Sequence, residues 1–226
     1  LGDVYKRQAY SIMRILVEPG RIKSGEILFE GQDIVKFSKK QMSEFRGKRV
    51  SIIFQDPMTS LNPVYTIGNQ IVEVILLHTK KTKQEAWARA KELLELVGIN
   101  EPEKRLKQYP HELSGGMRQR VMIALALIGA PKLLIADEPT TALDVVVQRE
   151  ILKELREIVK SESMSMLLVT HDLHLARDVA DRVSVMYAGY ILETGPVPRV
   201  LPNPAHPYTE GLLDAMPDLS LIHISE

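Results

Sequence analysis

The sequence contains no cysteine among its 226 residues. That absence excludes disulfide bonds, iron–sulfur clusters and cysteine-ligated zinc. An excess of charge of either sign is absent too, because 29 Lys and Arg balance 29 Asp and Glu, for a formal net charge of +0. A basic surface for nucleic acid is therefore not expected, and we predict no nucleic-acid partner.

A long apolar segment is also missing. The longest candidate, residues 121–136, is interrupted by Pro131 and Lys132 and is shorter than the roughly 20 residues that cross a bilayer. The first residues are polar and of mixed charge, unlike a signal peptide. We expect a soluble chain that reaches a membrane only through a partner.

The apolar pattern predicts an α/β fold. The length suits one large domain, or a core with a small appended subdomain. In the second half, continuous apolar strands are expected over residues 133–136, 166–169 and 183–187. An amphipathic helix is expected over residues 148–160. Such strands, separated by helices, indicate a parallel sheet covered on both faces.

The first half is expected to be mixed. Helical spacing predicts a helix over residues 9–17, followed by an edge strand over 26–30 and a buried strand over 50–54. Residues 62–113 look like a mainly helical insert, with a helix over 84–97.

Two adjacent carboxylates, Asp137 and Glu138, follow the expected strand 133–136. The C-terminal ends of strands are where open α/β sheets bind ligands. Asp137 is placed to hold Mg²⁺, directly or through water, and Glu138 to polarise an attacking water. A strand that merely ends in a polar turn is the alternative reading.

Gln55 and His171 also come just after expected strands. An amide there can contact Mg²⁺ or the attacking water, and it can sense a nucleotide. An imidazole there can contact a γ-phosphate, and its ordinary pKa near 6.5 lets modest changes in surroundings alter its charge. Taken singly, each is more often structural.

The stretch Leu113 to Met117 opens a helix. Ser114 can cap that helix, while Gly115 and Gly116 leave backbone N–H groups free to approach an anion. An ordinary capped helix with a flexible entry is the alternative reading.

Taken together and in this order, these features resemble the ATP-binding subunit of an ABC transporter. Gln55 matches the Q-loop and His171 the switch histidine. The signature, the Walker B strand and the D-loop are matched by residues 113–117, 133–138 and 142–144. The resemblance implies a P-loop NTPase (RecA-like) core with a mainly parallel sheet, a small antiparallel β edge and an inserted α-helical subdomain.

The resemblance also implies the cofactors ATP and Mg²⁺ and a division of roles. Asp137 and Gln55 would hold Mg²⁺, while Glu138 would be the general base. His171 would hold the γ-phosphate, and Gln55 would act with these two catalytic groups. The remaining nucleotide-binding residues would be Ser114, Gly115, Gly116 and Asp144.

The same resemblance implies the partners. Two ATP-binding subunits would pair head to tail, so that Ser114, Gly115 and Gly116 serve the partner's nucleotide and Asp144 lies at the seam. Transmembrane permease subunits would bind around Gln55 and the helical insert, and a substrate-binding protein would act indirectly. The expected location is the cytoplasmic face of the inner membrane.

Two stretches narrow the family. The ATPases of oligopeptide and dipeptide importers have a stretch similar to residues 55–63 (QDPMTSLNP) and a Met at the position of Met117. They also have a motif after the core that is similar to residues 203–209 (NPAHPYT) with Leu212-Leu213. The similarity covers about residues 9–217 and implies import of oligopeptides or dipeptides. Nickel or another substrate stays open.

One motif of the family has no match. The phosphate-binding loop (Walker A), G-x-x-x-x-G-K-[ST], does not occur in the sequence. By the resemblance, its lysine would fall near the position of Tyr5 and its Ser/Thr near that of Lys6. We expect no role for Lys6 without the glycines. Because that loop cradles the phosphates, this chain is expected to bind ATP poorly and to hydrolyse it at background rate.

The expected organisation has four parts. Residues 1–61 are a partial core without Walker A, 62–113 the helical subdomain, 114–200 the rest of the core, and 201–226 a C-terminal extension that is importer-like to about 217. We expect residues 1–8 and 218–226 to be foreign to an internal fragment.

Two rival functions stay open. A non-transport ABC ATPase of the chromosome-maintenance or translation-factor kind would carry coiled-coil insertions or two cassettes, and neither occurs in the sequence. An inactive fragment that acts only as an interaction module fits the missing loop.

Overall fold

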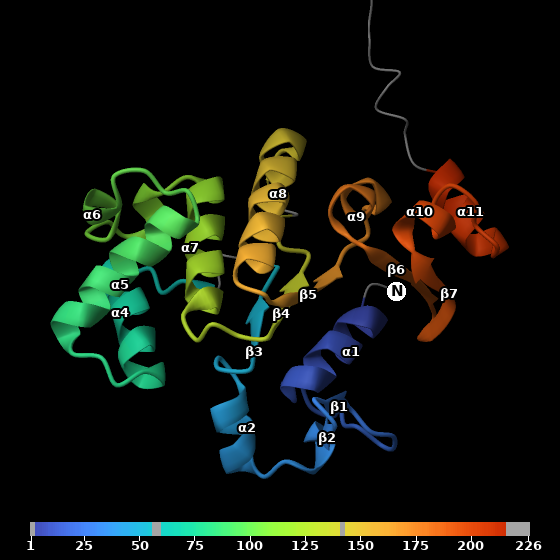
Figure 1. Cartoon of the computed structure of the whole chain (residues 1–226), viewed down its shortest axis with the longest axis horizontal. Coiled ribbons are helices and arrows are strands. Elements are labelled where there is room, and N and C mark those ends of the chain that lie inside the picture. Colours follow the sequence, from blue (N-terminus) through green and yellow to red (C-terminus); the bar gives the residue numbers. More distant parts are fainter. Residues whose placement is uncertain (1–2, 56–59, 141–142, 216–226) are drawn as a thin grey trace, which may run out of the picture. The chain divides into compact units, whose positions relative to one another are not determined.

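The computed structural model describes residues 3–55, 60–140 and 143–215, with residues 3–5 by their backbone alone. The stretch 56–59, Ala142 and the tail after 215 lie outside the described residues, so their expected roles are not tested. The chain forms two compact units, residues 6–169 and residues 1–5 with 170–226, and each is described by itself (Figure 1).

A three-stranded parallel sheet lies at the centre of the first unit. Its strands β3 (Val50–Ile53), β4 (Leu133–Asp137) and β5 (Ser165–Val169) stand in that order. The register pairs Ile53 with Ala136 and Asp137 with Val169. The C-terminal ends of β3 and β4 therefore lie side by side, as the unalternated apolar pattern predicted.

Both faces of this sheet are covered. On one face, Val50 and Ile135 pack with residues of α1 (Asp3–Met13) and α2 (Lys39–Phe45). On the other, α7 (Gly115–Leu127) contacts β3 and α8 (Val145–Ser161) contacts β5. The helices α7 and α8 are opposite α1 across the sheet (Figure 1).

The first helix differs from its expected bounds. We predicted residues 9–17, whereas α1 spans Asp3–Met13. The helix ends because Arg14 takes a left-handed conformation, with φ 49°. The amides of Arg14 and Ile15 then donate to the carbonyls of Ser11 and Tyr10, each at 3.1 Å, which closes the last turn.

A small antiparallel edge follows α1. The strands β1 (Leu28–Phe29) and β2 (Gln32–Asp33) form a hairpin, continued by the 3₁₀ turn η1 (Ile34–Lys36) and by α2. Ser38 and Gln41 cap α2 reciprocally. Phe29 and Phe37 meet the ring of Phe45 edge-on, at centroid distances of 5.0 and 5.8 Å.

A helical segment fills the chain between β3 and α7. It contains α4 (Ile67–His78), α5 (Lys83–Leu96), α6 (Pro102–Arg105) and the 3₁₀ turn η2 (Pro110–Glu112). Thr82 and Glu85 cap α5 reciprocally, and Gly98 ends it with a positive φ of 72°. The helices α4 and α5 pack on each other and on α7.

The second unit is built on an antiparallel hairpin of β6 (Arg182–Tyr187) and β7 (Tyr190–Pro196). We expected residues 183–187 to join the parallel sheet, and this was wrong. A two-residue turn, Ala188-Gly189, has positive φ at both positions and favours hairpin pairing.

Short helices surround that hairpin, namely α9 (Leu173–Val179), α10 (Val197–Val200) and α11 (Pro207–Asp214). The Glu193 carboxylate accepts hydrogen bonds from the amides of Ala205 and His206, at 2.9 and 3.2 Å. The stretch 203–209 is thereby tied to β7. Among the described residues, no helix is long and apolar enough to cross a membrane.

Candidate functional site

Gln55 and Glu138 meet at the C-terminal edge of the sheet. Gln55 comes two residues after β3, and Glu138 comes directly after β4. The Gln55 amide donates a 2.9 Å hydrogen bond from Nε2 to Glu138 Oε2. Side-chain groups from two neighbouring strands therefore lie together where open α/β sheets bind ligands.

Asp137 ends β4 and is fully buried, with 0% of its surface exposed. Its Oδ2 accepts a 2.7 Å hydrogen bond from the hydroxyl of Tyr10. Its Oδ1 is buried and has no hydrogen-bond donor within the described part of the chain. A buried carboxylate oxygen without a donor is costly unless a cation or water satisfies it.

Lys6, for which we expected no role, lies in the same site. Its ammonium donates a 2.6 Å hydrogen bond to Gln55 Oε1. It is 3.4 Å from Glu138 Oε1 and 4.0 Å from Asp137 Oδ1. The Lys6 ammonium thus faces both carboxylates.

Tyr10 is the second residue that the sequence analysis missed. Burial raises the pKa of its phenol, and the hydrogen bond to Asp137 and the charges of Asp137 and Glu138 raise that pKa further. The phenol therefore stays protonated at neutral pH and remains a donor. In the sequence it was only an apolar position on a helical stripe, which carries no sign of a polar contact.

Glu138 has an unusual backbone. Its φ is 45°, a left-handed conformation that is rare for residues other than glycine. Its amide donates a 2.8 Å hydrogen bond to the carbonyl of Val169 at the end of β5. A strained residue of this kind persists where its surroundings hold it, and such residues gather at functional sites.

The donor set suits magnesium. Mg²⁺ prefers oxygen ligands and usually takes only one or two carboxylates, completing its shell with water and phosphate. Asp137 Oδ1, without a hydrogen-bond donor, and the amide oxygen of Gln55 are oxygen atoms of the kind that Mg²⁺ prefers. In the described ranges no cluster of three or more His, Cys, Asp or Glu side chains could hold a metal by itself.

Ser114 and Asp144 cap neighbouring helices. Ser114 accepts from the amide of Met117 at 3.3 Å at the start of α7, as the sequence predicted. Asp144 accepts from the amide of Val147 at 3.0 Å at the start of α8. A Cβ on Gly115 would lie 3.2 Å from Leu143, so the start of α7 lies close to the residue that precedes the Asp144 cap.

His171 belongs to the second unit. In the sequence it comes two residues after β5 and just before Asp172, which caps α9 by accepting from the amides of His174 and Leu175. The structure thus brings Gln55, Asp137 and Glu138 together. The role of His171 beside them stays a prediction.

A comparison with family models gives two matches. The model described as ABC transporter matches residues 10–141, more than half of the chain. The chain belongs to the ABC transporter family. The second model, described as Oligopeptide/dipeptide transporter, C-terminal region, matches residues 192–221.

Curated relatives of this ABC transporter chain have closely related names. It is 57% identical over 210 residues to the oligopeptide transport ATP-binding protein OppD of Bacillus subtilis, covering 92% of this chain and 59% of the relative. It is 50% identical to the dipeptide transport ATP-binding protein DppD of Haemophilus influenzae, covering 93% and 64%. The chain therefore spans about three fifths of the length of these relatives.

Solved ABC cassettes share the fold. One is cbiO1 from Clostridium perfringens, part of the ABC transporter complex cbiONQ, at 30% identity with a TM-score of 0.72 over 86% of this chain and 73% of that one. Another is a dimeric ATP-binding cassette bound to ADP and Pi, at 23% identity and a TM-score of 0.71 over 85% and 82%. The core is thus that of a P-loop NTPase, with a parallel sheet, small antiparallel sheets and helices.

Proposed function

We propose that this chain is the ATP-binding and ATP-hydrolysing subunit of an importer for oligopeptides or dipeptides. The observation that carries this proposal is the hydrogen bond between Gln55 and Glu138 beside the buried Asp137. It lies in a chain that matches both the ABC transporter model and the C-terminal model of oligopeptide and dipeptide transporters.

Within the site, each residue has a proposed task. Asp137 and Gln55 would hold Mg²⁺ through their oxygens, and the ion when bound would neutralise charge on the phosphate oxygens. Glu138 would accept a proton from the attacking water. The hydrogen bond that the Gln55 amide donates to the same carboxylate would place Gln55 beside that water. Tyr10 keeps Asp137 oriented.

The remaining predicted residues act in an assembly. Ser114, Gly115 and Gly116 would bind the nucleotide of a second ATP-binding subunit in a head-to-tail dimer. Asp144 would lie at the seam, where the close contact of Gly115 with Leu143 would make the signature and the D-loop move together. His171 would contact the γ-phosphate. A solved cassette with this fold is itself dimeric.

The names of the relatives, which are those of transport ATP-binding proteins, support the proposed partners. Permease subunits would bind near Gln55 and the helical segment, and a substrate-binding protein would deliver the peptide to them. The chain would then work as a peripheral subunit on the cytoplasmic face of the membrane. The four-part organisation predicted from the sequence stays part of this proposal.

The chain by itself should bind ATP weakly. Its sequence contains no G-x-x-x-x-G-K-[ST], and the Lys6 ammonium faces the carboxylates that Mg²⁺ would use. Micromolar ATP affinity in a filter-binding assay would contradict this expectation.

An interaction module is the second candidate, and the position of Lys6 favours it. With its own carboxylates paired to Lys6, the chain would supply only the signature to a partner's nucleotide. A mixing experiment tests this. A homologous subunit with an intact P-loop and a defective signature is combined with this chain, and ATP hydrolysis is followed.

Restored hydrolysis is expected with the unaltered chain. Gly116→Asp should abolish it by repelling the phosphates, although a Cβ at Gly116 meets only Val147 at 3.4 Å and the helix should still form. Glu138→Gln is the matched second variant, because it changes this chain's own site and leaves the signature intact. Restoration that survives Gly116→Asp would overturn the assignment of the signature.

A further inference from the structure

Three lysines gather where the loop after α4 runs into the start of α5. Residues 79–84 read Thr-Lys-Lys-Thr-Lys-Gln, so Lys80, Lys81 and Lys83 occur there without an acidic residue inside this stretch. All three side chains are exposed. Lys83 is also the first residue of α5, whose N-terminus carries the positive end of the helix dipole.

Other basic side chains of the helical segment are paired. Lys91 forms an ion pair with Glu103 and lies 3.8 Å from Glu95. Arg89 pairs with Glu92 at 3.0 Å. By contrast, Lys80, Lys83 and the exposed Lys107 have no ion pair among the residues that the structure describes.

Glu85 is the acidic side chain beside this loop, and it is already engaged. Its carboxylate accepts 2.7 Å hydrogen bonds from the amide and the hydroxyl of Thr82. Those bonds, and to a smaller extent the charge of Lys81, hold the pKa of Glu85 below its usual range. The charge of Lys81 is therefore offset in part by Glu85.

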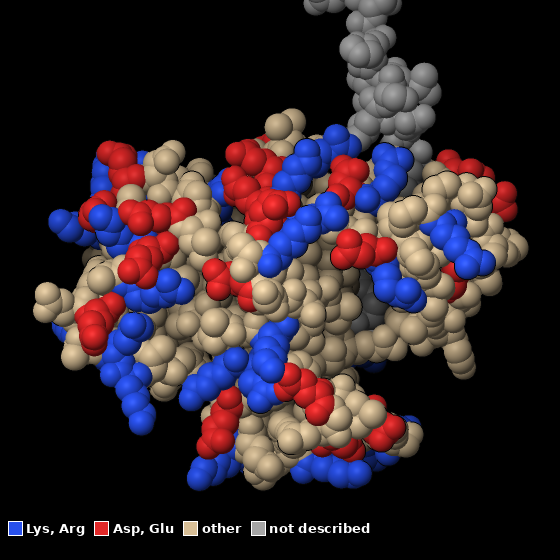
Figure 2. Space-filling model, in the orientation of Figure 1, with Lys and Arg blue, Asp and Glu red and all other residues tan. Residues whose placement is uncertain are grey.

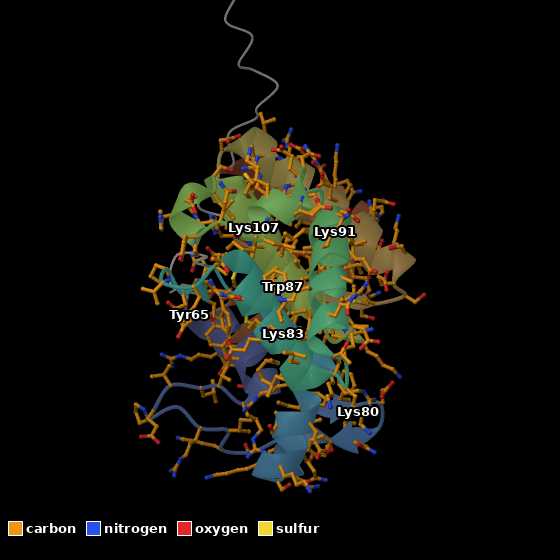
Figure 3. All side chains as sticks on the ribbon, turned by 90° about the vertical axis from the view of Figure 1, so that its left-hand side faces the viewer. Tyr65, Lys80, Lys83, Trp87, Lys91 and Lys107 are labelled. Carbon is orange, nitrogen blue, oxygen red and sulfur yellow. The ribbon has the colours of Figure 1, made fainter. Side chains whose placement is uncertain are left out.

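Exposed apolar side chains share this part of the molecule. Leu77 near the end of α4 is 76% exposed, and Tyr65 before α4 is 55% exposed. Trp87 on α5 is half-buried, because it packs over Gly68 of α4. Figure 3 shows Tyr65 and Trp87 on the same face as Lys80, Lys83 and Lys107.

We propose that this lysine face, defined as Lys80, Lys81, Lys83 and Lys107 with Tyr65 and Leu77, docks on an anionic membrane surface. Unpaired lysines attract anionic headgroups, and each improves binding by about fivefold, which is about 1 kcal/mol. Exposed Leu and Tyr side chains suit the boundary between headgroups and acyl chains. The flexible lysine stems can follow a fluid surface.

An acidic protein partner is the less favoured occupant. In Figure 2, basic and acidic side chains are interspersed over α4, α5 and α6 away from the lysine face. A protein partner of one charge would therefore find no extended complementary surface there. The cavity beside Phe45 and the cavity beside Met122 have no residue of the lysine face in their linings. An exposed face on which Lys80, Lys83 and Lys107 have no ion pair among the described residues fits a fluid anionic layer better than a shaped protein.

Vesicle co-sedimentation of the full chain tests this proposal. Vesicles of phosphatidylcholine with about one third phosphatidylglycerol are compared with pure phosphatidylcholine vesicles, at low and at high salt. The chain should bind the anionic vesicles, and the binding should weaken as salt screens the charges. The triple variant K80Q/K81Q/K83Q should bind at least tenfold more weakly.

The matched control removes the same charge elsewhere in the same compact unit. Lys39, Lys40 and Lys153 are exposed, and the variant K39Q/K40Q/K153Q should bind vesicles within about twofold of the unaltered chain. Leu77→Gln should reduce the binding that remains at high salt. Circular dichroism shows whether each variant is folded.

Two results would overturn the proposal. Equal loss in both triple variants would show attraction by net charge alone. Binding of a soluble poly-glutamate with no binding of anionic vesicles would indicate an acidic protein partner. The proposal adds a lipid contact to the peripheral location proposed above, and its test needs no nucleotide. Failure here therefore leaves the proposed ATPase function standing.

Discussion

Gln55 and Glu138 stand 83 residues apart in the sequence, yet their side chains share a 2.9 Å hydrogen bond. The parallel pairing of β3 with β4 produces this contact, because it aligns the ends from which the two side chains project. Lys6 and Tyr10 approach the same edge from α1. The site therefore depends on the packing of α1 against the sheet as much as on the strands.

Tyr10→Phe should destabilise the first unit. The substitution keeps the ring and removes the donor to Asp137 Oδ2, which leaves both oxygens of a fully buried carboxylate without a hydrogen bond. We expect a loss of about 1–3 kcal/mol in the free energy of unfolding, measured by chemical denaturation. Tyr190→Phe is the control, because Tyr190 is 74% exposed, and it should change stability by less than about 0.5 kcal/mol.

Gly129→Ala should be among the most damaging single substitutions in the chain. A Cβ there would overlap the carbonyl oxygen of Gly47 and lie 2.7 Å from its carbonyl carbon, so backbone would have to move. We expect a loss of about 3 kcal/mol or more. Gly211→Ala is the matched control in α11, where a Cβ would meet nothing within 4 Å. We expect this variant to leave the free energy of unfolding unchanged or to raise it slightly. Similar melting curves for the two variants would contradict this account.

Arg120 joins three helices and should show energetic coupling. Its Nη1 donates to the carbonyl of Val97 at 2.7 Å and to Glu154, and its Nη2 donates to Glu154 at 3.2 Å. A double-mutant cycle with Arg120→Met and Glu154→Gln should give a coupling of about 1 kcal/mol, reduced because the Glu154 side chain is 40% exposed. Additive effects of the two substitutions would show that the ion pair contributes nothing.

His78 should make stability depend on pH. Burial, and next the charge of Lys48, lower its pKa below the ordinary 6.5. The unfolded chain therefore takes up the proton first as the pH falls, so the free energy of unfolding should decrease in the window just below pH 6.5. His78→Gln should flatten that decrease, and Lys48→Gln should move the imidazole pKa back toward 6.5. An NMR titration that places the His78 pKa at or above 6.5 would disprove the assignment.

Much of the local structure could be predicted from residues alone. The strand that leads to Asp137, the cap at Ser114 and the end of the helix near residue 97 are short-range features, so residue types along the chain predict them. The expected strand over 183–187 exists, but its partner was wrong. An apolar run does not say which strand it will pair with, and here a hairpin turn decides.

By itself, then, the sequence determined the α/β class, the polar groups at the strand ends and the resemblance to ABC transporters, since these depend on periodicity and on neighbours along the chain. Only the tertiary structure decided that Gln55 bonds to Glu138, that Tyr10 holds Asp137, and that Lys6 faces both carboxylates. Those contacts join residues 83 to 132 positions apart, so they exist only once the strands and α1 have packed, and no local pattern encodes the distance between them.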